Sequence, residues 1–135
     1  MSHKILVADD EYFITRSLAF MLRKEGYECR TAADGKAALE LIRRDPPDLA
    51  ILDLDMPGMD GEEVARRVKE DERLRRVHVV ILTAKGEPMS PGWRERMAAD
   101  ELLFKPFEPR RLLEYIQKVL ERRSRGEGAP DAEAK

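Results

Sequence analysis

The sequence predicts a doubly wound α/β domain in which five helices cover both faces of a five-stranded parallel sheet, giving three layers. Short apolar runs typical of strands alternate with longer segments whose apolar residues recur at helical spacing. The third such run, residues 49–54, stays apolar until Asp53, as expected for a strand buried on both faces. A chain of 135 residues is long enough for one domain of this kind.

Five short apolar segments are expected to form the strands, because each is bounded by charged or turn-forming residues. In chain order they are residues 4–8, 27–32, 49–54, 77–82 and 101–105. Their alternation with helical segments favours parallel pairing, since successive parallel strands need a crossover connection.

Helices are expected between the strands and after the last one. Four of them are predicted at residues 12–25, 34–44, 61–69 and 109–123. Gly26 is typical of a helix C-terminus, and Asp34 and Asp60 are typical of N-caps. The remaining helix should lie between the last two strands, within residues 85–98. Two prolines and two glycines there leave room only for a short helix beginning near Ser90.

The composition limits the classes of function. Charged residues make up 39% of the chain and hydrophobic residues 42%, yet the net charge is only −2, which favours neither nucleic-acid nor membrane binding. A single cysteine, Cys29, excludes an internal disulfide and is expected to be a small buried hydrophobe. Two Arg-rich stretches, residues 67–76 and 121–125, are interpreted as solvated faces rather than nucleic-acid contacts.

The chain has no apolar run of the roughly 18 residues that a membrane helix needs, and its start lacks the apolar core of a signal peptide. We therefore expect a cytoplasmic protein without membrane contact. Residues 1–121 are predicted to form the domain. Residues 122–135 lack apolar periodicity and are predicted to be a disordered tail or a linker.

Polar side chains stand where several of the predicted strands end. They are Asp9, Asp10, Asp53, Thr83 and Lys105. The carboxyl ends of the strands in an open parallel sheet share one edge, where ligands bind. Three carboxylates crowded at this edge repel one another unless a cation lies among them. Oxygen ligands are those that Mg²⁺ prefers, and Mn²⁺ is the alternative ion. A carboxylate nucleophile beside Mg²⁺ can form an acyl phosphate, which Lys105 and Thr83 would contact.

Four motifs together make the sequence resemble the receiver domain of two-component response regulators, and the single-domain chemotaxis type in particular. They are ILVADDE, ILDLDMPGMDG, ILTAKG and LLFKPF, and the likeness extends from residue 4 to about residue 121. It implies a flavodoxin-like fold with the strand order 2-1-3-4-5. It also implies a phosphoprotein that takes a phosphoryl group from a phosphohistidine of a sensor histidine kinase or a histidine phosphotransfer protein.

By this resemblance Asp53 is the phosphoacceptor and a metal ligand, because the family places a proline, here Pro57, four residues later. Asp10 corresponds to the direct metal ligand and Asp9 to the water-mediated one. Asp55 corresponds to the residue whose backbone carbonyl binds the metal.

The resemblance also assigns residues of the last two strands. Thr83 corresponds to the switch hydroxyl and Lys105 to the phosphate-contacting lysine, and Pro106 is expected to follow a cis peptide bond. Leu102, a second switch position, stands where the family usually has an aromatic residue that moves with the threonine. Phe104 lies on the same face of the strand. The face made by helix four, strand five and helix five is the expected surface for a downstream partner.

Two other functions stay open. The D-x-D pattern of Asp53 and Asp55 superficially matches haloacid-dehalogenase-like phosphatases, although the second acidic pair, Asp9 and Asp10, lies upstream rather than downstream. The departure at Leu102 is compatible with a receiver-like docking module that is read without phosphorylation. The receiver interpretation itself predicts a protein that catalyses only its own phosphoryl transfer and hydrolysis and is not otherwise an enzyme.

Overall fold

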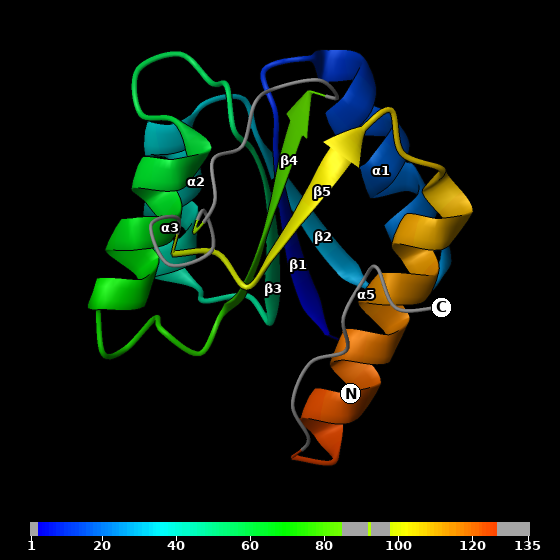
Figure 1. The fold of residues 1–135 in the computed structure, drawn as a ribbon. Coiled ribbons are helices and arrows are strands. Elements are labelled where there is room, and N and C mark those ends of the chain that lie inside the picture. The colour runs from blue at the N-terminus through cyan, green and yellow to red at the C-terminus, as the bar shows by residue number, and fades with distance from the viewer. Residues whose placement is uncertain (1–2, 85–91, 93–97, 127–135) are drawn as a thin grey trace.

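The computed structural model describes residues 3–84, 92 and 98–126, and within them five strands form one parallel sheet (Figure 1). The strand order is β2-β1-β3-β4-β5, which confirms the order that the family resemblance implies. The strands are β1 (Lys4–Ala8), β2 (Glu28–Ala32), β3 (Leu49–Asp53), β4 (His78–Ala84) and β5 (Glu101–Lys105). Each begins and ends within about two residues of its predicted position, and β4 includes Thr83 instead of stopping before it.

Four helices are present in the described part of the chain, namely α1 (Tyr12–Lys24), α2 (Gly35–Arg44), α3 (Gly61–Glu70) and α5 (Pro109–Ser124). Asp34 and Asp60 cap α2 and α3 as predicted, and each side chain accepts a hydrogen bond of 2.8 Å from a backbone N–H of the first turn. The helix predicted within residues 85–98 falls outside the described residues. None of the described helices is long and apolar enough to cross a membrane.

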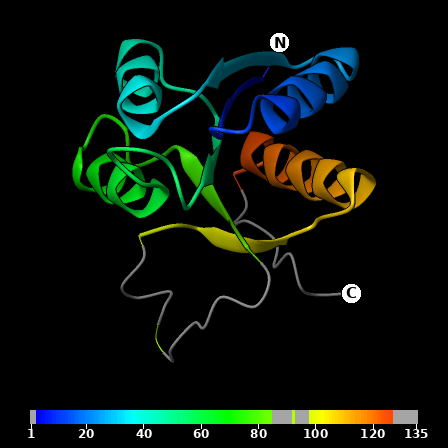
Figure 2. The ribbon, with the colours of Figure 1, turned by 90° about the horizontal axis from the view of Figure 1, so that it is seen from above.

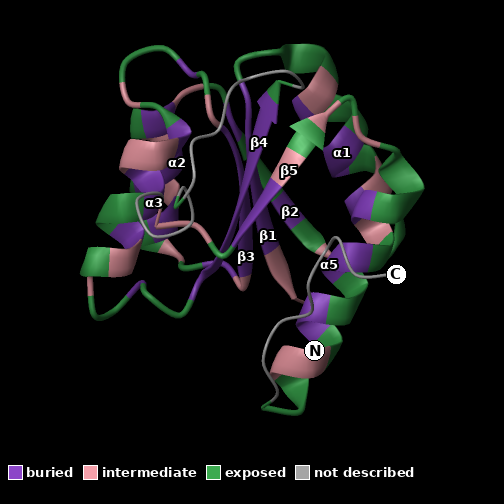
Figure 3. Ribbon diagram, in the orientation of Figure 1, coloured by how far each residue is buried: buried purple, intermediate pink, exposed green. Residues whose placement is uncertain are grey.

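The sheet has a hydrophobic core on each of its faces. Helices α2 and α3 cover one face and α1 and α5 the other (Figure 2). The first core contains Leu52 and Ile81, and the second contains their strand neighbours Ile51 and Leu82. All five residues of β3 are buried, which explains why this strand is apolar at successive positions up to Asp53 (Figure 3).

The parallel register brings the strand ends to a common edge of the sheet. Ala8 lies opposite Leu52, and Asp53 lies opposite Leu82. Asp9 directly follows β1 and Asp53 is the last residue of β3, each one residue beyond this pair, so the two residues lie side by side. The pairing of the strands thus places two carboxylates together before any side-chain interaction is considered.

The start of α3 lies against the end of β3, and a glycine stands at the contact. The Gly61 N–H donates a hydrogen bond of 3.0 Å to the carbonyl oxygen of Leu54. An ideal Cβ at Gly61 would lie 2.5 Å from the carbonyl oxygen of Asp53, which is closer than real Cβ atoms approach a backbone oxygen. The absence of a side chain at residue 61 therefore lets α3 pack close to the backbone of Asp53.

Replacing Gly61 by alanine is expected to lower the free energy of unfolding by about 1–3 kcal/mol, because the added methyl group forces α3 and the end of β3 apart. This cost should exceed the gain of about 1 kcal/mol that alanine has over glycine in a helix. Urea unfolding measures the difference. Lys36→Ala, an exposed position in the first turn of α2, is the control and should change stability by less than about 0.5 kcal/mol. Wild-type stability of Gly61→Ala would contradict the packing argument.

Candidate functional site

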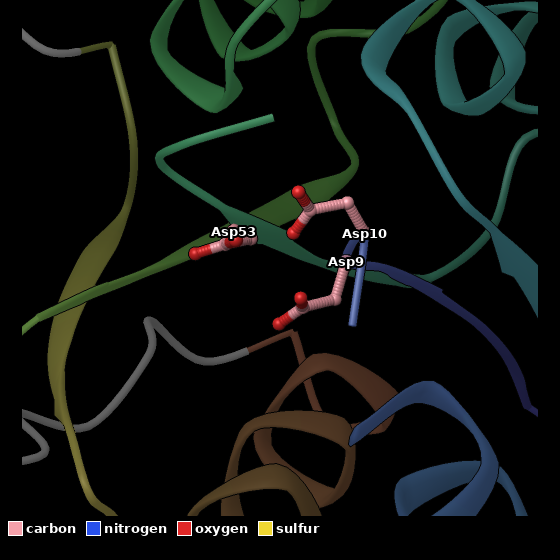
Figure 4. Close-up of side chains that lie close together, drawn as sticks. All are labelled: Asp9, Asp10 and Asp53. Atoms are coloured by element: carbon pink, nitrogen blue, oxygen red, sulfur yellow. The ribbon is translucent and has the colours of Figure 1, made fainter. Parts of the chain in front are cut away.

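Three carboxylates gather at the carboxyl edge of the sheet, as the strand ends require. One oxygen from each of Asp9, Asp10 and Asp53 lies within 4.8 Å of the others, and we call these residues the acid cluster (Figure 4). Asp9 and Asp53 are 1% and 5% exposed, whereas Asp10 faces solvent. The structure thus combines two buried acids with one that is open to a metal ion or a ligand.

Lys105 supplies the positive charge among these acids. Its Nζ donates hydrogen bonds of 3.0 Å to Asp9 Oδ2 and 3.1 Å to Asp53 Oδ1. Burial lowers the pKa of Lys105, but the hydrogen bonds to Asp9 and Asp53 and the negative charges of both acids together outweigh it, so that the pKa lies above its ordinary value. The ammonium is therefore charged at neutral pH and links β1, β3 and β5 at the site.

Asp53 is the acid that the surroundings perturb most clearly. Burial raises the pKa of its carboxyl group to about 6, the hydrogen bond from Lys105 opposes this shift, and the charge of Asp9 adds to it. The carboxylate form of Asp53 therefore pays a desolvation cost that a further cation would relieve. Oxygen donors in this arrangement suit Mg²⁺, which prefers one or two carboxylates together with water and phosphate oxygens.

The loop between β1 and α1 holds Asp9 in place from its other side. Asp9 Oδ1 accepts a hydrogen bond of 2.9 Å from the backbone N–H of Glu11, while Oδ2 accepts from Lys105. The Glu11 carboxylate also lies 3.7 Å from Lys105 Nζ. Glu11 was not among the predicted site residues, although it stands directly after the Asp9-Asp10 pair and is part of the first motif.

Thr83 carries a polar atom with an unmet hydrogen-bonding capacity. The residue is fully buried in β4, one position beyond the partner of Asp53 in the sheet, and its Oγ1 has no hydrogen-bond partner within the described part of the chain. A buried hydroxyl without a partner costs about 1–3 kcal/mol, so such groups usually have a reason. A phosphoryl oxygen bound at the strand ends would satisfy it.

The remaining predicted residues lie around this centre. The peptide bond between Lys105 and Pro106 is cis. Asp55 is exposed on the loop after β3. Leu102 is 2% exposed and belongs to the core under α2 and α3, whereas Phe104, two residues along β5, is 39% exposed. Phe104 therefore does not fill the core position that Leu102 occupies.

Comparison with known sequences identifies a family. The family model of the response regulator receiver domain matches residues 5–117. The phosphate regulon transcriptional regulatory protein PhoB of Pseudomonas aeruginosa is 39% identical over 123 residues, which make up 91% of this chain and 54% of that protein. The chain thus spans about half the length of this curated relative.

Solved structures agree with this match. The REC domain of AraT, a response regulator from Geobacillus stearothermophilus, shares 32% identity with a TM-score of 0.79, over 93% of this chain and 98% of that one. The chemotaxis protein CheY4 of Vibrio cholerae shares 31% identity with a TM-score of 0.77, over 88% of this chain and 99% of that one.

The raised pKa of Asp53 predicts how metal-free protein responds to pH. In the folded protein this group binds its proton near pH 6, whereas in the unfolded chain it does so near its ordinary value of 3.8. The folded state therefore gains stability, relative to Asp53→Asn, as the pH falls from about 6 to about 4. At neutral pH Asp53→Asn should be more stable than wild type by about 1–3 kcal/mol.

Urea unfolding in the presence of a chelator, repeated across this pH range, measures the effect. Asp55→Asn is the matched control, because it removes an exposed carboxylate two residues away. Its free energy of unfolding, relative to wild type, should not change with pH in the way expected for Asp53→Asn. A stability difference between wild type and Asp53→Asn that does not change with pH would show that the desolvation of Asp53 is wrongly assigned.

Proposed function

The chain belongs to the response regulator receiver family, the phosphoacceptor domains of two-component signalling, and we propose that Asp53 is its phosphoacceptor. The observation that carries this assignment is the contact of a buried Asp53 carboxylate with Lys105 Nζ, 3.1 Å away, beside the acids Asp9 and Asp10. A nucleophilic oxygen, a fixed cation and metal-binding carboxylates are the parts that phosphoryl transfer to an aspartate needs.

The proposed reaction is an in-line displacement at phosphorus. A carboxylate oxygen of Asp53 forms the new O–P bond while the P–N bond of a phosphohistidine breaks and the imidazole leaves with its electron pair. Lys105 stays in contact with the acids and neutralises charge on the transferred group. Because Asp53 has a pKa of about 6 without metal, most of it is already ionised at neutral pH and no separate base is required.

Receiver domains bind Mg²⁺ in an acidic pocket, and the acid cluster has the donors that this ion prefers. In this chain we propose that the side chains of Asp10 and Asp53 and the backbone carbonyl of Asp55 hold the ion, with Asp9 acting through water. Mn²⁺ would use the same oxygens. When bound, the ion would offset the charge of the acids and of the phosphoryl oxygens.

Thr83 is the proposed sensor of the phosphoryl group, because its buried Oγ1 lacks a partner in the described structure and a phosphoryl oxygen would accept its hydrogen bond. The switch role of Leu102 stays a prediction. Leu102 is already packed in the core, so its response to Thr83 would be a repacking of apolar contacts rather than the inward movement of an aromatic ring.

The proposed phosphodonor is a sensor histidine kinase or a histidine phosphotransfer protein. A downstream protein partner is proposed at the face that includes β5 and α5, without direct nucleic-acid or membrane contact. The relative PhoB is a transcriptional regulatory protein, but this chain matches only about half of it, so any output activity stays a proposal.

Three other expectations also stay predictions: the absence of a further enzymatic activity, the cytoplasmic location and the domain boundary at residue 121. Helix α5 extends beyond that boundary, to Ser124.

Acetyl phosphate with Mg²⁺ is expected to phosphorylate the protein once per chain. Asp53→Asn should abolish this label, because the variant lacks the nucleophilic oxygen. Lys105→Ala should slow labelling by about 10²-fold or more, since it removes a fixed cation that faces the transferred group. Phosphate-affinity electrophoresis or intact-protein mass spectrometry measures the label over time.

Asp55→Asn is the matched control, because it keeps the backbone carbonyl and should still be labelled. Removing Mg²⁺ with a chelator should prevent labelling of every variant. Undiminished labelling of Asp53→Asn would contradict the proposed acceptor. Continuous release of phosphate from a small phosphate ester, instead of one label per chain, would favour the haloacid-dehalogenase-like alternative.

A further inference from the structure

A polar hollow of about 580 Å³ lies at the opposite edge of the sheet from the acid cluster, where the strands begin. Its lining includes Lys69, Arg75, Arg76 and Arg123, together with Asp48 and Asp100. We call this site the basal hollow. Its volume lies within the range of about 300–1,000 Å³ that is usual for small-molecule sites.

Two Arg-rich stretches, which from the sequence alone are expected to be solvated faces, meet at the basal hollow. Residues 67–76 comprise the end of α3 and the turn before β4, and residues 121–125 comprise the end of α5. The fold brings these helix ends to the edge of the sheet where β1 also begins (Figure 1). Arg76 and Arg123, about fifty residues apart in the chain, therefore both line the basal hollow. The spacing of charges within either stretch does not indicate that they meet.

The two acids in the lining already have hydrogen-bond or ion-pair partners within the protein. Asp48 Oδ2 accepts a hydrogen bond of 2.8 Å from the backbone N–H of Lys4. Asp100 Oδ2 accepts one of 2.8 Å from the Val79 N–H and lies 2.7 Å from Lys69 Nζ. Lys69 also donates to two backbone carbonyls at the end of the turn before β4. Asp48, Asp100 and Lys69 thus serve the fold rather than an incoming ligand.

Within the part of the chain that the structure describes, the arginines of the lining have no comparable partners. Among the described residues, Arg76 and Arg123 form no ion pair, and Arg75 has only a 3.9 Å contact with Glu72, whose side chain is 86% exposed. Four cations and two carboxylates in the lining leave a formal charge of +2 in a chain whose net charge is −2. Part of the Arg123 charge compensates the carbonyl end of α5, which leaves Arg75 and Arg76 as the least compensated.

The positive charges around the basal hollow also affect His78, a buried residue at the start of β4. It is 4% exposed and hydrogen-bonds Tyr115 on α5 over 2.8 Å. Burial lowers the pKa of His78 to about 4, and the charges of Lys69 and Arg123 contribute in the same direction against the opposing effect of Asp100. His78 is therefore neutral at physiological pH and does not add to the charge of the hollow.

We propose that the basal hollow binds a small phosphate-bearing anion, such as a nucleoside diphosphate, through Arg75, Arg76 and Arg123. A planar guanidinium matches a phosphate group with two parallel hydrogen bonds, and arginines on two walls of a hollow can contact more than one phosphate oxygen. A concave site with few cations suits a compact anion better than a nucleic-acid duplex, which needs a longer basic surface.

Isothermal titration calorimetry with ADP and with adenosine, in buffer that contains a chelator, tests this proposal. Without divalent ions the acid cluster repels phosphate, so binding there does not interfere. ADP is expected to bind, and adenosine is not. The double variant Arg76→Gln, Arg123→Gln should weaken ADP binding at least about tenfold, since each lost contact is a charge-assisted hydrogen bond.

Arg73→Gln is the matched control, because Arg73 belongs to the same stretch but is absent from the lining, and its side chain is 76% exposed. It should leave ADP affinity unchanged. The double variant should still accept a phosphoryl group from acetyl phosphate with Mg²⁺, which shows that it is folded. No binding of ADP to wild type, equal binding of adenosine, or unchanged affinity of the double variant would overturn the proposal. Tighter binding of a short DNA duplex than of ADP would overturn it in favour of a nucleic-acid surface.

Discussion

The contact of Lys105 with Asp9 and Asp53 is the interaction on which the site depends. Two acids that are 1% and 5% exposed would repel each other and lose hydration at the end of a buried strand pair. A single ammonium, donating to both over 3.0 and 3.1 Å, makes that arrangement tolerable in the absence of metal. The same ammonium belongs to β5, so the contact joins the edge strand of the sheet to its two central acids. Burial of Asp53 still outweighs this stabilisation, which leaves an acid that gains from a further cation.

The parallel sheet explains why these groups meet, because its register determines which residues share an edge. Asp53 lies opposite Leu82, so Thr83 follows immediately on the neighbouring strand, and Asp9 emerges beside Asp53 from β1. Because Gly61 has no side chain, α3 packs close to the backbone of Asp53, and the Gly61 N–H donates a hydrogen bond to the Leu54 carbonyl oxygen. The ends of α3 and α5 lie at the opposite edge of the sheet, and the arginines of the basal hollow lie there with them. One sheet thus separates an acidic edge from a basic one.

Much of the fold and of the site could be predicted from local patterns. The caps Asp34 and Asp60, the apolar run that ends at Asp53 and the burial of Cys29 follow from chemistry that acts within a few residues. The contact of Glu11 with Lys105 and the hydrogen bond between His78 and Tyr115 could not be predicted, because each joins residues far apart in the chain. The same holds for the convergence of Arg76 and Arg123, since the spacing of charges within one helix does not reveal which other helix end lies beside it.

The most direct test of the account is to locate the phosphoryl group chemically. Borohydride reduction of the acetyl-phosphate-treated protein converts an acyl-phosphorylated aspartate to homoserine, and tandem mass spectrometry of the peptide that contains residues 51–61 then identifies the position. Homoserine is expected at residue 53, because among the described contacts only that carboxylate of the peptide lies against Lys105, and it is buried at the strand end. Homoserine at Asp55 or Asp60, or in the peptide that carries Asp9 and Asp10, would contradict it.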